Sequence, residues 1–109
     1  MVSVSERMHD FGWAVKAFNE NKYSFVNLYI TYDYLRRCIH NDRKQTVKYI
    51  VNHGFASQDE LDHFRDTANN YRHAKNTLGR AEMQVADAML LMMKLIESIA
   101  IDRFRALSP

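Results

Sequence analysis

The stretch from Val85 to Ala100 constrains the fold of this 109-residue chain most strongly, because twelve of its sixteen residues are apolar. A helix at the edge of a small protein normally has one apolar stripe and a broad polar face. Here only a narrow polar seam remains, formed by Asp87, Lys94 and Ser98. A membrane span needs about 20 largely uncharged residues, and charges interrupt this stretch. The sequence therefore predicts a helix that is enclosed on most sides, as the central post of a helical bundle, and no membrane segment.

The remainder of the chain contains few residues that interrupt helices, with three glycines and a single proline at the end. Apolar residues also recur at helical spacing, three and four residues apart. Together these features predict one domain over residues 1–109, folded as an all-α antiparallel bundle of four helices, or of five if the last one divides. The expected helices begin near residue 4, run from about 23 to 40, form a short segment ending at 52, and start again at 58.

The apolar pattern of the fourth helix continues without interruption into the stretch from Val85 onwards. Residues 58–104 are therefore expected to form one long C-terminal helix of about 70 Å, at 1.5 Å per residue. Gly79 marks the position where this helix would kink or break, since glycine costs about 1 kcal/mol against alanine in a helix interior.

Two local signals define the ends of the middle helices. Gly54 suits the left-handed residue that follows a helix, and Phe55 after it can fold back onto Ile50, as in a Schellman motif. Ser57 and Glu60 match the capping box, in which each side chain accepts a hydrogen bond from the other residue's backbone amide. Both predict a helix ending near residue 52 and another starting near residue 58.

The single cysteine, Cys38, excludes an internal disulfide, and the first residues contain no apolar signal core. We therefore expect a reducing, cytoplasmic location. Two Glu-x-x-His pairs, Glu6 with His9 and Glu60 with His63, have the spacing of di-iron bundle ligands. Because both glutamates are already explained as capping-box residues, we expect no metal and no cofactor.

A basic cluster surrounds the joint between the second and third helices, although the net charge of the whole chain is only +2. Such a cluster can be a solvated helix face, or it can bind an anionic ligand or nucleic acid. Its members are Arg36, Arg37, His40, Arg43, Lys44 and Lys48.

The stretch FRDTANNYRHAK resembles the active-site helix of HEPN domains, small helical proteins of which many are dimeric ribonucleases. Their signature is an arginine, a polar residue, and a histidine after four to six intervening residues. Here seven residues separate Arg65 from His73, and Arg72 directly precedes the histidine. The resemblance implies that Arg65, Asp66 and His73 occupy the catalytic positions of a metal-independent ribonuclease or of a degenerate relative.

Several apolar faces exceed what one short chain can cover, so we expect a homo-oligomer, most simply a two-fold dimer. Trp13 lies opposite the buried stripe of the first helix and is expected to contact a partner. The expected oligomer interface comprises Val26, Ile30, Met89, Met92, Ile96 and Ile99. The sequence thus predicts a small non-enzymatic binding or regulatory protein, such as an inhibitor, adaptor or assembly factor, that binds itself and another protein. The alternative is the HEPN-like ribonuclease.

Overall fold

The structure, a computed structural model, describes residues 4–73 and 82–104, and every regular element within these residues is a helix. The prediction of an all-α chain is therefore confirmed for this part of the chain. The elements are α1 (Val4–Glu20), α2 (Phe25–Ile39), α3 (Arg43–Asn52), α4 (Gln58–His73), α5 (Val85–Ile99) and a π-helical turn, η1 (Ala100–Phe104). None of the described helices has the length and apolar character that crossing a bilayer requires.

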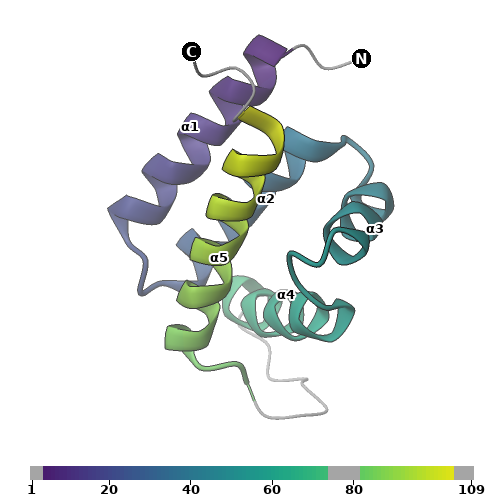
Figure 1. The fold of residues 1–109 in the computed structure, drawn as a ribbon. Coiled ribbons are helices and arrows are strands. Elements are labelled where there is room, and N and C mark those ends of the chain that lie inside the picture. Colours follow the sequence, from purple (N-terminus) through teal and green to yellow (C-terminus); the bar gives the residue numbers. More distant parts are fainter. Residues whose placement is uncertain (1–3, 74–81, 105–109) are drawn as a thin grey trace.

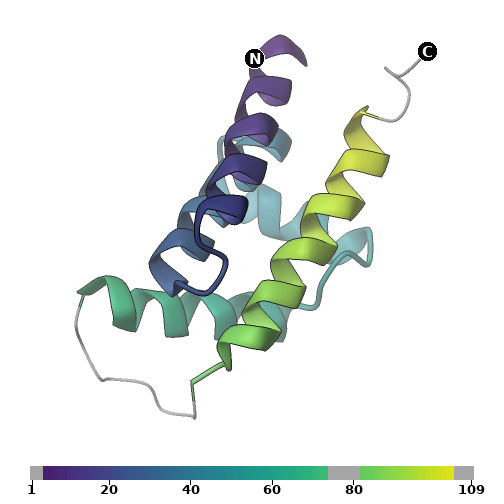
Figure 2. The same cartoon turned by 90° about the vertical axis from the view of Figure 1, so that its left-hand side faces the viewer.

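Helix α2 occupies the centre of the molecule and packs against α1, α3, α4 and α5. Helices α1 and α2 run antiparallel, joined by a short loop, as Figure 1 shows. Helix α4 lies across the direction of α5 in both Figure 1 and Figure 2. The axes are therefore only partly aligned, and the expected antiparallel bundle is realised most clearly in the α1–α2 hairpin.

The expectation of one helix over residues 58–104 is wrong, because residues 82–84 are not helical and α5 begins at Val85. Hydrogen bonds hold the segment before α5 against α4 instead. The backbone amide of Met83 donates to the buried hydroxyl of Thr67 at 3.0 Å, and the Tyr71 hydroxyl donates to the Glu82 carboxylate at 2.9 Å. Gly79, the expected position of a kink or break, lies outside the described residues.

Helix α5 is also not the enclosed central post that its composition suggests. Its inner side is buried, with Met92 and Leu95 fully inaccessible, but its outer side faces away from the core. Leu90 and Met93 on that outer side are 58% and 42% exposed. The physical reason is that α5 packs along α2 on one side only, while α4 crosses beneath it and leaves the other side open.

The predicted signals at the helix ends are confirmed. Gly54 has a φ of 71°, and the amide of Phe55 donates to the carbonyl of Ile50 at 3.0 Å, as a Schellman motif requires. Ser57 and Glu60 form the reciprocal capping box, with bonds of 3.0 and 3.1 Å. These two motifs turn the chain sharply between α3 and α4.

An aromatic cluster joins α4 to the central helix. Phe64 is fully buried, stacked on Tyr29 at 6.4 Å between ring centroids and edge-on to Tyr32 at 5.7 Å. Phe25 and Tyr71 stack at 4.9 Å one turn or more away along the same two helices. Aromatic pairs at such separations stabilise a core by more than their buried area alone.

The π-helical turn after α5 is held against α3 by one side chain, Tyr49. Its hydroxyl donates a hydrogen bond to the carboxylate of Asp102, and the Arg103 guanidinium lies 4.5 Å from the centre of its ring. Partial burial and the bond to Asp102 raise the pKa of Tyr49 above its usual value, and the charge of Arg103 partly opposes this.

This raised pKa predicts an alkaline loss of stability. The folded chain holds the Tyr49 proton more tightly than the unfolded chain, in which tyrosine ionises near about pH 10. The stabilisation is therefore complete below about pH 10 and is lost as the pH rises through the higher folded pKa. Urea unfolding from about pH 8 to about pH 11 should show a smaller decline for Tyr49→Phe than for the unmodified chain. Identical pH profiles for the two proteins would contradict the assignment.

Candidate functional site

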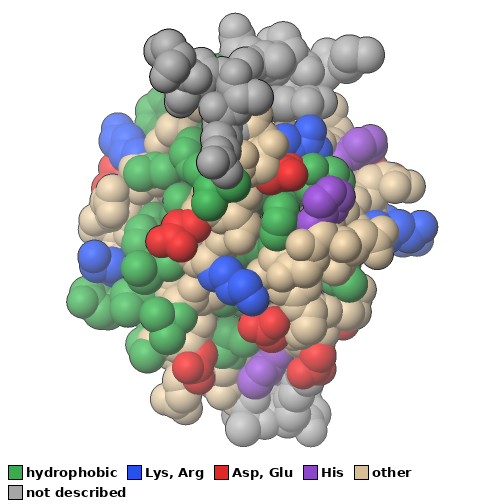
Figure 3. All heavy atoms as spheres, viewed as in Figure 1, with side chains coloured by type: hydrophobic (Ala, Val, Ile, Leu, Met, Phe, Trp, Pro, Cys, Tyr) green, Lys and Arg blue, Asp and Glu red, His purple; other side chains and the backbone are tan. Residues whose placement is uncertain are grey.

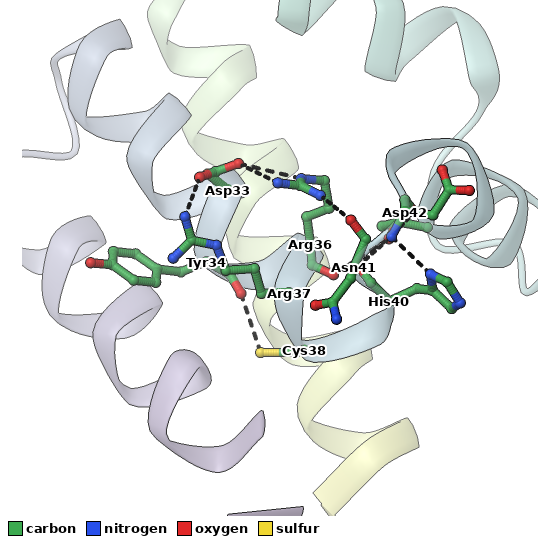
Figure 4. Close-up of polar contacts among 9 residues, drawn as sticks. Asp33, Tyr34, Arg36, Arg37, Cys38, His40, Asn41 and Asp42 are labelled. Atoms are coloured by element: carbon green, nitrogen blue, oxygen red, sulfur yellow. Dashed lines mark hydrogen bonds and ion pairs between the residues drawn. The ribbon is translucent and has the colours of Figure 1, made fainter. Parts of the chain in front are cut away.

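The structure brings the predicted basic cluster together at the corner between α2 and α3, but two of its arginines are already paired (Figure 4). The Asp33 carboxylate accepts from Arg36 at 3.0 Å and from Arg37 at 3.1 Å. Arg36 also donates to the backbone carbonyl of Asn41 at 3.0 Å, and its side chain is only 15% exposed. Arg36 therefore closes the end of α2, whereas Arg37 remains open to solvent.

The turn from α2 into α3 is fixed by short-range hydrogen bonds. The backbone amide of Asp42 donates to Nδ1 of His40 at 2.8 Å, and the Asp42 side chain caps α3 by accepting from the amide of Lys44 at 2.9 Å. The buried hydroxyl of Thr46 donates to the His40 carbonyl at 3.1 Å. These hydrogen bonds fix the backbone of the corner from which the basic side chains extend.

The remaining cations of the cluster lie on α3. Arg43, Lys44 and Lys48 are exposed, and no ion pair among the described residues involves them. Arg43 and Lys44 occupy the first turn of α3, where the helix dipole is positive and a cation costs about 0.3–1 kcal/mol. Their placement is unfavourable for the helix dipole, and the carboxylate of Asp42 at the N-cap offsets it.

Positive charges also act on the buried hydroxyl of Tyr32 in α2. Burial raises the pKa of the Tyr32 hydroxyl, while the positive charges of Arg65, Arg36 and Arg43 oppose that rise. These three arginines come from α4, α2 and α3, so three helices contribute charge to one region. Arg65 is distant in sequence from the joint between α2 and α3, and only the fold brings α4 next to α2.

The predicted surface residue Trp13 lies at the centre of an aromatic and cationic cluster on α1 and α2. Its ring is 42% exposed and stacks on Tyr34 of α2 at 6.4 Å between centroids, with a 23° tilt. The ammonium group of Lys16 lies 4.8 Å from the Trp13 ring, and the Arg37 guanidinium lies 5.3 Å from the Tyr34 ring. The contacts therefore run from α1 through Tyr34 to the basic corner.

Two shallow hollows adjoin Trp13, one on each side. The first has a volume of about 340 Å³ and lies along α1, and the second, of about 190 Å³, lies in the groove between α1 and α2. The first is lined by Met8, His9, Gly12, Trp13 and Lys16, and the second by Trp13, Lys16, Ala17, Glu20, Asn27, Ile30 and Tyr34.

The structure places the residues of the predicted oligomer interface in different environments, some buried, some partly buried and some exposed. Met92 and Ile99 are fully buried within the single chain, so their assignment to an intermolecular surface is wrong. Met89 and Ile96 are partly buried at the flank of the core, beside the exposed outer side of α5. Figure 3 shows hydrophobic side chains gathered where α1 and α5 lie, interrupted by single charged groups. Val26 and Ile30 are exposed on a different surface, the outer side of α2.

The residues of the HEPN-like alternative lie on α4. Arg65 is paired with Asp62 at 2.9 Å, and Asp66 is exposed. The backbone of α4 is helical through His73, which places Arg65 and His73 about 12 Å apart along the axis. The side chains of Arg72 and His73 lie outside the described part of the structure, so this alternative stays a prediction.

A polar hollow of about 420 Å³ lies between the start of α4 and the start of α5. Glu60 and His63, one of the two predicted Glu-x-x-His pairs, lie on its wall, and Glu60 is engaged in the capping box with Ser57. In the part of the chain that the structure describes, no group of three or more His, Cys, Asp or Glu side chains is arranged to hold a metal ion.

Comparison with protein-family models, with curated proteins and with solved structures gives no match for this chain.

Proposed function

We propose that the chain is a non-enzymatic helical binding protein that acts as a homodimer, with the outer side of α5 as its self-association surface. The observation that carries this proposal is the exposed apolar side of α5. Its apolar members are Ala86, Leu90, Met93 and Ile101, flanked by Met89 and Ile96, and the exposed Glu97 lies between Met93 and Ile101 on the same side.

An apolar strip of this kind favours association because a soluble monomer rarely exposes a contiguous apolar patch larger than a few hundred Å². A second copy of the chain fits the strip well, since a two-fold interface pairs each surface with itself. The charges beside the strip support such pairing. Asp87 and Lys94 lie two turns apart on the same edge, too far apart to pair within one helix. In an antiparallel α5–α5 contact, each Asp87 lies opposite Lys94 of the second copy.

Leu90→Glu should therefore dissociate the dimer without unfolding the chain, because Leu90 is already 58% exposed in the single chain. Light scattering at tens of micromolar should give a mass near twice the 12.9 kDa of one chain for the unmodified protein, and a single-chain mass for the variant. Circular dichroism should show the same helix content for both.

Two controls make this test specific. Val26→Glu, on the outer side of α2, should leave the dimer intact if α5 is the interface. The single changes Asp87→Lys and Lys94→Asp should each weaken the dimer by placing like charges opposite each other, and the double change should restore it. A single-chain mass for the unmodified protein would contradict the proposal, and dissociation by Val26→Glu alone would move the interface to α2.

With α5 occupied by a second copy, the surface around Trp13 on α1 and α2 remains open on the other side of the central helix. A dimer of this form presents two equivalent binding surfaces. This arrangement suits an adaptor or assembly factor, which gains avidity from two sites on one particle.

A further inference from the structure

We propose that the face formed by α1, the end of α2 and the start of α3 binds single-stranded nucleic acid. We refer to this face as the basic-aromatic track, and its residues are Trp13, Lys16, Tyr34, Arg37, Arg43 and Lys44. This activity is separate from the proposed self-association, because the track lies on α1, α2 and α3 and includes no residue of α5.

Ring and cation contacts link the residues of the track on α1 and α2, and the turn after α2 leads to those on α3. Trp13 stacks on Tyr34, and the Arg37 guanidinium lies over the Tyr34 ring. From Arg37, the chain leads through the end of α2 and Asn41 to the first turn of α3, as Figure 4 shows. Aromatic rings thus occupy one end of the track, and cations occupy its length.

The charge of the track favours a polyanion. Lys16, Arg37, Arg43 and Lys44 are its cations, with Lys48 one turn further along α3. Asp33, which is shared between Arg36 and Arg37, and the exposed Asp42, which caps α3 beside Lys44, oppose these cations without matching their number. A strand of phosphates that contacts such cations gains affinity from the release of its counterions.

Trp13, which is 42% exposed, distinguishes a nucleic acid from other polyanions, because a base can replace the Lys16 ammonium over its ring. An unpaired base can stack on an aromatic side chain whatever its sequence, while its phosphates contact nearby cations. Trp13 supplies such a ring between two hollows, with Lys16 beside it. Bases within a duplex are already stacked on each other, and an acidic peptide has no base to stack. The combination therefore favours a single strand of RNA or DNA.

Trp13 also makes the proposal directly measurable, because it is the only tryptophan in the chain. Its fluorescence should be quenched when oligouridylate or oligothymidylate of about twelve nucleotides is added at low salt. A matching RNA and DNA pair of the same mixed sequence identifies which of the two is preferred. A duplex of that sequence and polyglutamate should bind at least tenfold more weakly than the single strands.

Variants separate stacking from charge when binding is followed by anisotropy of a labelled oligonucleotide. Trp13→Ala should weaken binding roughly 5- to 150-fold without changing the salt dependence. Arg37→Ala and Lys44→Ala should each lower the slope of log affinity against log salt concentration by about 0.7, the value for one phosphate on a single strand. Lys22→Ala, in the loop at the opposite end of α2, should change neither quantity.

Several outcomes overturn the proposal: no quenching and no binding at low salt, equal binding of duplex and single strand, or equal binding of polyglutamate. The Leu90→Glu variant, measured in parallel, keeps the two proposals apart. Its track is intact, so it should bind a labelled strand with the same affinity per chain whether or not the unmodified protein is a dimer.

Discussion

Replacing Met92 by glutamate should leave the chain unfolded or close to unfolding at room temperature. Met92 is fully buried on the inner side of α5, where this helix packs on α2. An unpaired carboxylate in such a position costs several kcal/mol, or remains neutral at a raised pKa. Because small domains are stable by only about 5–15 kcal/mol, this single change consumes much of the total. Circular dichroism and a thermal melt measure the loss.

Leu90→Glu is the matched comparison, since it places the same carboxylate two residues earlier in the same helix. Leu90 is exposed, so this variant should keep its helix content. As a single chain it should melt at the temperature at which the unmodified single chain would melt. If Met92→Glu instead remained folded and only dissociated, Met92 would belong to an intermolecular surface after all. The side of α5 that faces α2 would then be assigned incorrectly.

The contrast between these two residues shows how much the sequence pattern indicates about this helix. Apolar periodicity identifies the buried side of a helix only when the other side is polar. Between Val85 and Ala100 apolar residues outnumber polar ones, but Asp87, Lys94 and Ser98 form a polar seam that indicates which side of the helix faces outward. The sequence predicts a helix enclosed on most sides, whereas the single chain leaves Leu90 and Met93 exposed. Leu90 lies three and four residues from the charged Asp87 and Lys94, whereas Met92 has apolar residues at these spacings, which agrees with Leu90 outside and Met92 inside.

Local signals, in contrast, predict the helix ends well. The Schellman motif at Gly54 and the capping box of Ser57 and Glu60 depend on residues within one turn of each other. For the separation of α4 from α5, the sequence offers Gly79, which lies outside the described residues. The separation involves the bond from the amide of Met83 to Thr67, sixteen residues away, which exists only once the chain has folded back.

The candidate binding surface also combines contacts that the sequence predicts with contacts that only the fold creates. The pairing of Asp33 with Arg36 and Arg37 follows the three- and four-residue spacing of neighbours on a helix and is visible in the sequence. That spacing already indicates that two of the six predicted basic residues are partly neutralised. The stack of Trp13 on Tyr34 joins two helices, so the sequence predicts an exposed tryptophan but not the aromatic and cationic track that it begins.

In α4, the substitution that lowers stability most should be at a residue whose long-range contacts join this helix to the central helix. Phe64 is fully buried and contacts Tyr29 and Tyr32, both on the central helix. Helix α4 lies across the direction of α5 and packs on α2, and Phe64 is its fully buried aromatic side chain in that contact. Phe64 therefore contributes a large share of the contact that holds α4 in place.

Phe64→Ala should lower the free energy of unfolding by about 3–5 kcal/mol, the usual cost of truncating a buried phenylalanine. Phe55→Ala is the matched control: the same atoms are removed, but Phe55 is only partly buried against the core, so the loss should be clearly smaller. Urea unfolding followed by circular dichroism gives both values, with a similar dependence on denaturant expected for the two variants. If Phe64→Ala lost no more stability than Phe55→Ala, α4 would be held chiefly by contacts other than the aromatic cluster, such as the bond between Thr67 and Met83.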